Sequence, residues 1–107
     1  MELDVRRLKI LREVALRGTI AAAADALGFT PSALSQQLSA LERQTGTGLL
    51  ERGGRRARLT REGQILVQQT ERILSGLEEA QAALEHARGT VNGELRLAAS
   101  GSIARDF

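Results

Sequence analysis

The segment from residue 18 to residue 41, GTIAAAADALGFTPSALSQQLSAL, predicts two short helices joined by a tight turn. Thr19 is an expected N-cap, because its hydroxyl can accept a hydrogen bond from a backbone N–H of the first turn. Gly28 falls where a helix C-terminus needs a left-handed residue. Thr30 and Pro31 then restart the chain as a cap and as the residue best suited to the first helical position. The segment therefore predicts a helix-turn-helix.

The second helix of this hairpin separates apolar from polar side chains. Leu34, Leu38 and Leu41 recur at helical spacing and predict one inward stripe. The opposite face is polar and almost free of acid, which suits the major groove of DNA, where side chains bind base edges by hydrogen bonds. Taken alone, the hairpin could equally be scaffold. The polar side chains are Ser32, Ser35, Gln36, Ser39 and Arg43.

An arginine-rich segment, residues 49–59, follows the hairpin and is called the wing below. Gly53-Gly54 predicts the tip of a β-hairpin, with residues 49–50 and 57–59 as short flanking strands. A basic wing beside a recognition helix can contact phosphates or a neighbouring minor groove, although an arginine-rich loop without a ligand is an alternative. In and just after the wing there are five arginines and no acid between residues 52 and 61: Arg52, Arg55, Arg56, Arg58 and Arg61.

The distribution of charge along the chain also favours DNA as the partner. The formal net charge is only +2, but residues 1–64 hold 11 Arg and Lys against 7 Asp and Glu, whereas residues 65–107 hold 4 against 6. Because the positive half contains the helix-turn-helix and the wing, we expect double-stranded DNA to bind there. No cysteine is present and His86 is the only histidine, so no metal site and no thiolate nucleophile are expected.

Other functional classes find little support in the sequence. There is no nucleophile–base pair and no phosphate-binding glycine loop, so we expect no enzyme activity and no cofactor. No apolar run approaches the length of a membrane span or the core of a signal peptide. We therefore expect a cytoplasmic protein that does not insert into membranes.

A long helix is predicted from residue 61 to residue 88, with Thr60 as its cap. Apolar residues recur along it at alternating spacings of four and three, a heptad pattern typical of paired helices. We predict a homodimer through this helix, and the alternative is a helix that packs only on its own domain. The seam comprises Leu66, Thr70, Ile73, Leu77, Ala80, Leu84, Ala87 and Val91, of which Leu66, Ile73, Leu77 and Leu84 are assigned to the dimer contact.

The sequence predicts a helix near the N-terminus and a strand near the C-terminus. A first helix is expected over residues 4–17. Near the other end, Asn92-Gly93 is a turn signal and residues 94–97 alternate as a strand does. Because an isolated strand is not stable, residues 90–107 are expected to be the truncated start of a further domain. The inward stripe of the first helix is expected to be Leu8, Leu11 and Ala15.

One ordered pattern runs through these elements: Gly18-Thr19-Ile20, Ala23-Ala24, Leu27, Ser32-Ala33-Leu34-Ser35-Gln36-Gln37-Leu38, Leu41-Glu42, Gly46, Leu49-Leu50, Arg52, Leu59-Thr60 and Gly63. In order and spacing it resembles the N-terminal region of LysR-type transcriptional regulators. The departures are few. Ile20 and Leu50 stand where that family usually has Phe, Pro31 where the residue is commonly polar, and Gln36 where many members have Arg.

The resemblance implies a mainly α fold with three segments. Residues 1–60 would form a winged helix-turn-helix DNA-binding domain, residues 61–89 a linker helix that pairs as an antiparallel homodimer, and residues 90–107 the start of an effector-binding domain. Family members bind interrupted inverted repeats near promoters and sense a small-molecule effector through the C-terminal domain, which is almost wholly absent here. A tetramer of the full-length protein is compatible with this arrangement.

Specific DNA contacts follow from the chemistry of the polar face. We assign base edges to Ser32 and Gln36, because a glutamine can form two hydrogen bonds with adenine. Pro31 is assigned to a thymine methyl group. Phosphate and minor-groove contacts are assigned to Thr30, Ser35, Arg52, Arg55 and Arg56.

The main competing hypothesis is a protein–protein module, in which the heptad helix binds a partner and the hairpin is scaffold.

Overall fold

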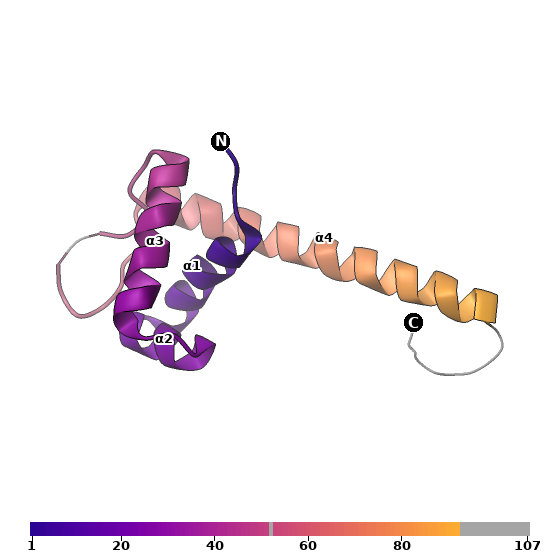
Figure 1. The fold of residues 1–107 in the computed structure, drawn as a ribbon. Coiled ribbons are helices and arrows are strands. Elements are labelled where there is room, and N and C mark those ends of the chain that lie inside the picture. The colour runs from indigo at the N-terminus through magenta and orange to yellow at the C-terminus, as the bar shows by residue number, and fades with distance from the viewer. Residues whose placement is uncertain (52, 93–107) are drawn as a thin grey trace. The chain divides into compact units, whose positions relative to one another are not determined.

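The computed structural model describes residues 1–51 and 53–92, and this part of the chain is mainly helical. Its four helices are α1 (Val5–Arg17), α2 (Ile20–Leu27), α3 (Pro31–Thr45) and α4 (Arg61–Asn92) (Figure 1). The chain divides into two compact units, Met1–Glu71 and Arg72–Phe107. The first unit contains α1, α2, α3, the wing and the start of α4, and the second contains the remainder of α4.

The first three helices begin where the sequence predicts, and α1 and α2 also end where it predicts. Each starts behind a side chain that accepts a backbone N–H of the first turn, at 2.9 Å for Asp4, 3.0 Å for Thr19 and 3.1 Å for Thr30. Such caps satisfy donors that have no partner within the helix. Each helix ends at a glycine with a left-handed backbone, which an L-residue with a Cβ rarely adopts. These glycines are Gly18, Gly28 and Gly46.

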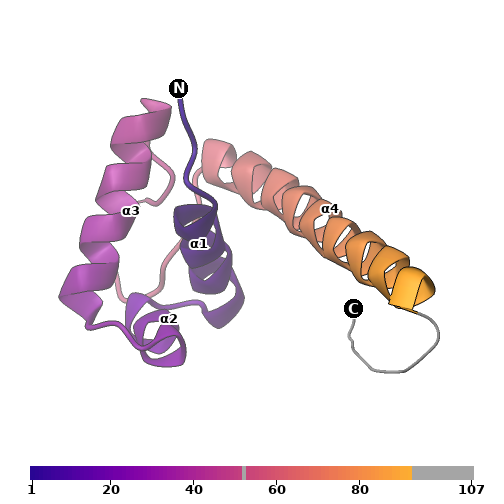
Figure 2. The same ribbon diagram turned by 45° about the vertical axis from the view of Figure 1, so that its right-hand side comes forward.

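An aliphatic core joins α1, α2 and α3. The small side chains of Ala23 and Ala24 are buried and let α2 approach its neighbours closely, and α1 contacts both α2 and α3 (Figure 2). Ala15, predicted to face inward, is exposed, whereas Val14 is fully buried. Because α1 packs on two neighbours, its buried surface turns toward Val14. The buried core comprises Leu8, Ile10, Leu11, Val14, Ala23, Ala24, Leu34, Leu38, Leu41 and Leu49.

The wing folds around one isolated antiparallel bridge between Leu50 and Leu59. Two backbone hydrogen bonds of 2.8 and 3.0 Å flank this bridge. Beyond the bridge, the N–H of Ala57 donates to the carbonyl oxygen of Gly18 at 2.9 Å and ties the second side of the wing to the turn between α1 and α2. The predicted pairing is thus confirmed, but the prediction of two flanking strands is wrong.

The start of α4 is capped by Thr60, whose Oγ1 accepts the N–H of Gly63 at 3.0 Å. The helix continues through Gly76 and Gly89 to Asn92, beyond the predicted end at residue 88. None of Gly63, Gly76 and Gly89 has a positive φ. These glycines therefore continue the helix and do not end it, although glycine has a low helix propensity. The strand predicted over residues 94–97, and most of the segment 90–107, lies outside the described residues.

Candidate nucleic-acid interface

The polar face of α3 lies at the surface of the first unit. Leu34, Leu38 and Leu41 point into the core, as predicted, and fix the rotation of the helix about its axis. Arg7 adds a polar constraint, because its Nε donates to Oε1 of Gln37 at 2.9 Å and so ties α1 to α3. The outward side chains share one surface pocket of about 490 Å³, which is lined by Ser32, Ser35, Gln36, Ser39 and Arg43.

The N-terminal end of α3 carries two further assigned residues, Thr30 and Pro31, and both are exposed. The hydroxyl oxygen of Thr30 accepts the N–H of Ala33, but a hydroxyl group can still donate its own proton to a phosphate. Partial positive charge at a helix N-terminus favours an anion at the same place. Thr30 and Pro31 therefore stand at the end of α3 where a phosphate is most easily bound.

The tip of the wing is formed at Gly53 and Gly54, which both have positive φ, at 92° and 78°, and Arg55 and Arg56 follow it in the sequence. Arg55 is exposed. Arg56 is also exposed, but its guanidinium lies over the turn between α1 and α2, where a Cβ added to Gly18 would come within 2.8 Å of Nη2. Arg52 lies outside the described residues. Of the two assigned wing arginines that the structure describes, Arg55 is thus the better placed to contact a separate partner.

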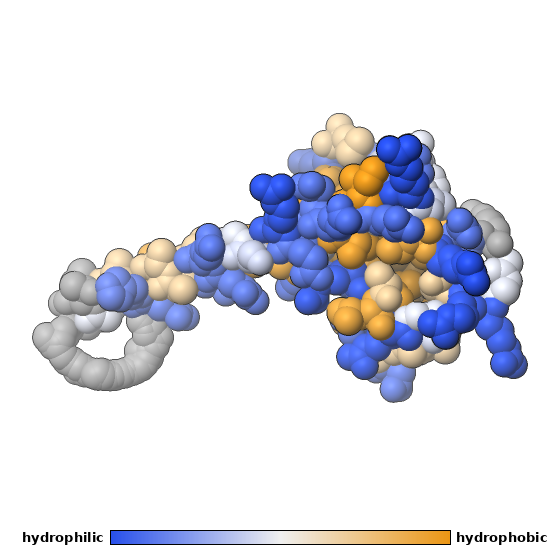
Figure 3. Space-filling view, turned by 180° about the vertical axis from the view of Figure 1, so that it is seen from behind, coloured by the Kyte–Doolittle hydropathy of each residue, from blue (hydrophilic) through white to orange (hydrophobic). Residues whose placement is uncertain are grey.

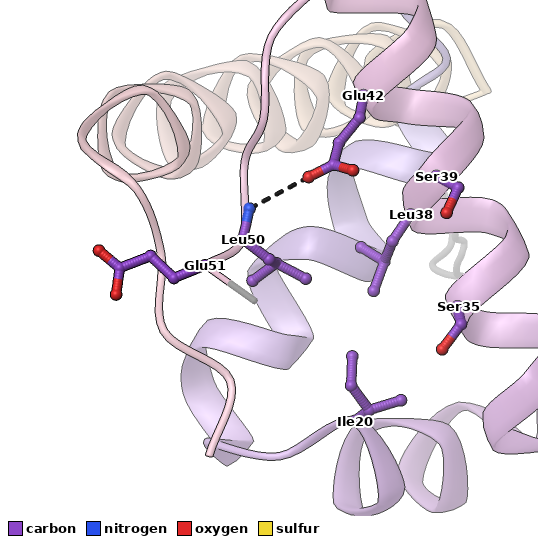
Figure 4. Close-up of a pocket in the computed structure, with 7 residues that line it drawn as sticks. All are labelled: Ile20, Ser35, Leu38, Ser39, Glu42, Leu50 and Glu51. Carbon is purple, nitrogen blue, oxygen red and sulfur yellow. Dashed lines mark hydrogen bonds between the residues drawn. The ribbon is translucent and has the colours of Figure 1, made fainter. Parts of the chain in front are cut away.

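Glu42 was missed by the sequence analysis as a site residue. Its Oε2 accepts two backbone hydrogen bonds from the start of the wing, at 2.8 Å from the N of Leu49 and 3.2 Å from the N of Leu50. Figure 4 shows the second of these bonds. Glu42 is the only acid in α3. An isolated acid on an otherwise acid-free helix beside a basic segment was the available signal for a structural role.

The predicted dimer seam divides into two parts. Leu66 packs against the core of its own unit, and Thr70 is fully buried, with its hydroxyl donating to the carbonyl oxygen of Leu66 at 2.8 Å. An ion pair of 2.9 Å between Arg12 and Glu71 also joins α1 to the start of α4. The remaining assigned residues are partly exposed, at 37%, 43% and 58% for Ile73, Leu77 and Leu84. Their role in a dimer stays a prediction.

The first unit also exposes apolar side chains among polar ones, as one face of the molecule shows (Figure 3). Leu16 is 64% exposed and Ile65 is 50% exposed.

Within the described part of the chain, no helix has the length and apolar character needed to cross a membrane. The same residues contain no group of three or more His, Cys, Asp or Glu side chains that could hold a metal ion.

Comparison with known proteins places this architecture in one family. Residues 5–64 match the family described as bacterial regulatory helix-turn-helix protein, lysR family. An uncharacterized HTH-type transcriptional regulator of Azotobacter vinelandii is 39% identical over 101 residues, which are 94% of this chain and 70% of that protein. The chain therefore belongs to the LysR family of bacterial helix-turn-helix regulators.

Two further similarities bear on the extent of the match. A probable RuBisCO transcriptional regulator of Chlorokybus atmophyticus is 40% identical over 94 residues, and the aligned region covers 88% of this chain but only 30% of that regulator. A crystal structure of the CbnR DNA-binding domain in complex with DNA has a TM-score of 0.73 at 31% identity, covering 83% of this chain and 99% of that one. The predicted fold, a winged helix-turn-helix with a following long helix, and the predicted class of DNA-binding transcriptional regulator are confirmed.

Proposed function

We propose that this chain binds double-stranded DNA in a sequence-dependent manner through the exposed face of α3. The observation that carries the proposal is the acid-free surface pocket formed by Ser32, Ser35, Gln36, Ser39 and Arg43. These side chains project from one face of a helix whose opposite face is locked in the core. A helix with such a polar face can enter the major groove, where each base pair presents a distinct set of donors and acceptors.

Roles within this interface follow from side-chain chemistry. Ser32 and Gln36 bind base edges, with Gln36 forming two hydrogen bonds to an adenine, and Pro31 contacts a thymine methyl group. Thr30 and Ser35 bind phosphates and hold α3 in register. The wing contacts phosphates or the adjacent minor groove through Arg52, Arg55 and Arg56.

The assembly proposed for this chain is a homodimer through α4. Ile73, Leu77 and Leu84 expose apolar surface at heptad spacing on a helix that would otherwise leave it in water. Residues 1–60 act as the DNA-binding domain and residues 61–89 as the linker helix. A two-fold dimer of this kind matches an interrupted inverted repeat near a promoter.

The role of the whole protein is regulatory rather than catalytic, in this proposal. Residues 90–107 begin a domain that binds a small-molecule effector, and full-length copies assemble as dimers or tetramers. The DNA-bound protein works in the cytoplasm. The DNA-binding domains of CbnR and BenM, which are 31% and 30% identical to this chain, have been solved in complex with DNA, and this supports the DNA-binding part of the proposal.

The proposal predicts different effects for two exposed residues. Gln36→Ala should relax base preference at one base pair per half-site, because a glutamine bound to a base edge supplies about 1–3 kcal/mol of discrimination. Arg55→Ala should weaken binding to all duplexes and reduce the salt slope by about one, because a phosphate contact carries no base information. Selection from a random duplex library, followed by titration at several salt concentrations, measures both effects.

An unchanged selected motif for Gln36→Ala, with affinity retained, would remove Gln36 from the base-binding residues. Salt-insensitive binding, or no binding to any duplex, would favour the competing protein–protein module.

A further inference from the structure

Glu42 lies where an acid is unfavourable for a DNA-binding protein. Its carboxylate helps to line a pocket of about 160 Å³ between α2, α3 and the wing, together with Ser35 and Ser39 of the proposed DNA-binding face (Figure 4). A negative charge beside a DNA-binding surface repels the phosphates. An acid at this position therefore calls for a compensating structural role.

The hydrogen bonds of Glu42 provide such a role. Leu50 pairs with Leu59 in the bridge, but its N–H does not take part in that pairing. Instead the N–H groups of Leu50 and of the preceding Leu49 both donate to the same carboxylate oxygen, at 3.2 and 2.8 Å. Hydrogen bonds to a charged acceptor are stronger than those between neutral groups. Glu42 thus fastens the first side of the wing directly to α3.

The other hydrogen bonds in and beside the wing lead to elements other than α3. The N–H of Ala57 donates to Gly18 in the turn between α1 and α2, and the hydroxyl of Thr60 donates to the carbonyl oxygen of Gly48 at 2.7 Å. Neither contact joins the wing to α3. Among the hydrogen bonds of the described residues that connect side chains to the wing, those of Glu42 are the ones that originate on α3.

We propose that Glu42 is a positioning residue that holds the wing in a fixed relation to α3, so that Arg55 and the polar face of α3 contact DNA as one unit. This inference rests on the proposed DNA-binding function. It predicts the direction in which DNA affinity changes when Glu42 is replaced. Loss of a negative charge by itself should tighten DNA binding, whereas loss of the positioning contact should weaken it.

Glu51 provides the matched control. It is exposed, it lines the same pocket, and Figure 4 shows its carboxylate pointing away from Leu50 and Glu42. The probe is a labelled duplex selected from a random library by the unmutated 107-residue chain, and affinity is measured by fluorescence anisotropy. We expect Glu51→Gln to bind equally well or somewhat more tightly. We expect Glu42→Gln to weaken binding about threefold and Glu42→Ala about tenfold, as for loss of charge-assisted hydrogen bonds.

A double-mutant cycle with Arg55 separates positioning from a general loss of stability. Arg55→Ala should weaken binding about tenfold in the unmutated chain but less than about twofold in the Glu42→Ala background, because contacts that act as one unit are not additive. Thermal melting without DNA confirms that each variant is folded at the assay temperature. If Glu42→Ala is unfolded there, the cycle is run with Glu42→Gln.

Equal or tighter binding by Glu42→Gln, or additive losses in the cycle, would overturn the role of Glu42 while leaving the proposed function intact. Failure of the unmutated chain to prefer any duplex would overturn the proposed function itself. An Arg55→Ala variant that binds as tightly as the unmutated chain would overturn both the wing contact and the role of Glu42.

Discussion

A chain carrying Gly63→Ala should unfold roughly 15 °C below the unmutated chain. Gly63 is buried in the first turn of α4, and a Cβ at this position would overlap the carbonyl oxygen of Leu49 and lie 3.2 Å from Cδ2 of Leu59. A backbone carbonyl cannot rotate away as the end of a flexible side chain can. The start of α4 or the wing must therefore shift, at a cost of about 3 kcal/mol, which corresponds to such a change in melting temperature in a domain of this size.

Gly76→Ala is the matched control for this effect. Gly76 lies in the same helix, and a Cβ there would meet no atom within 4 Å. Because alanine favours the helix over glycine by about 0.5–1 kcal/mol, this variant should melt at the same temperature or higher. Thermal denaturation followed by circular dichroism measures both variants. If Gly63→Ala were as stable as Gly76→Ala, the close contact between α4 and the wing would be wrong.

Leu77→Asp should convert the proposed dimer into a monomer. Leu77 is 43% exposed at the middle of the heptad pattern, and the two-fold symmetry of a homodimer would place a new carboxylate in the contact twice. An unpaired charge in such an interface costs about 3 kcal/mol or more, which raises the dissociation constant at least about a hundredfold. Sedimentation velocity at micromolar concentration should show a monomer, and binding to an inverted repeat should fall to the level of a single half-site.

Ser75→Asp tests whether the position of the charge matters. Ser75 is exposed and lies two residues away, off the heptad seam, so the same carboxylate there should leave the dimer intact. A dimer of Leu77→Asp that sediments like the unmutated chain would move the interface elsewhere. The exposed Leu16 on α1 would then become the next residue to replace.

Local sequence signals predicted the helices of the first unit well. Asp4, Thr19 and Thr30 cap helices because a short side-chain oxygen can reach the N–H groups of a first turn, and this depends on only a few neighbouring residues. The outward face of α3 could be predicted for a similar reason, since Leu34 and Leu38 fix which side of the helix is buried.

Features that depend on distant parts of the chain were not predicted. Ala15 is exposed because α1 has two helical neighbours, which its own periodicity does not reveal. The hydrogen bond from the N–H of Ala57 to the carbonyl oxygen of Gly18 joins residues far apart in the sequence, so no local pattern reveals it. The isolated acid in α3 indicated a structural role for Glu42, but the contacts of Glu42 and Gly63 with Leu49 could not be predicted, because both require the wing to fold back onto helices that precede and follow it.

The ratio of specific to non-specific DNA affinity decides whether α3 binds base edges. The chain would be titrated, at one physiological salt concentration, against the duplex that it selects from a random library and against a scrambled duplex of equal length and composition. The proposed base contacts of α3 predict that the selected duplex carries an inverted repeat and binds about a thousandfold more tightly or better. Equal affinity for the two duplexes would show that α3 does not bind base edges, and would contradict the account.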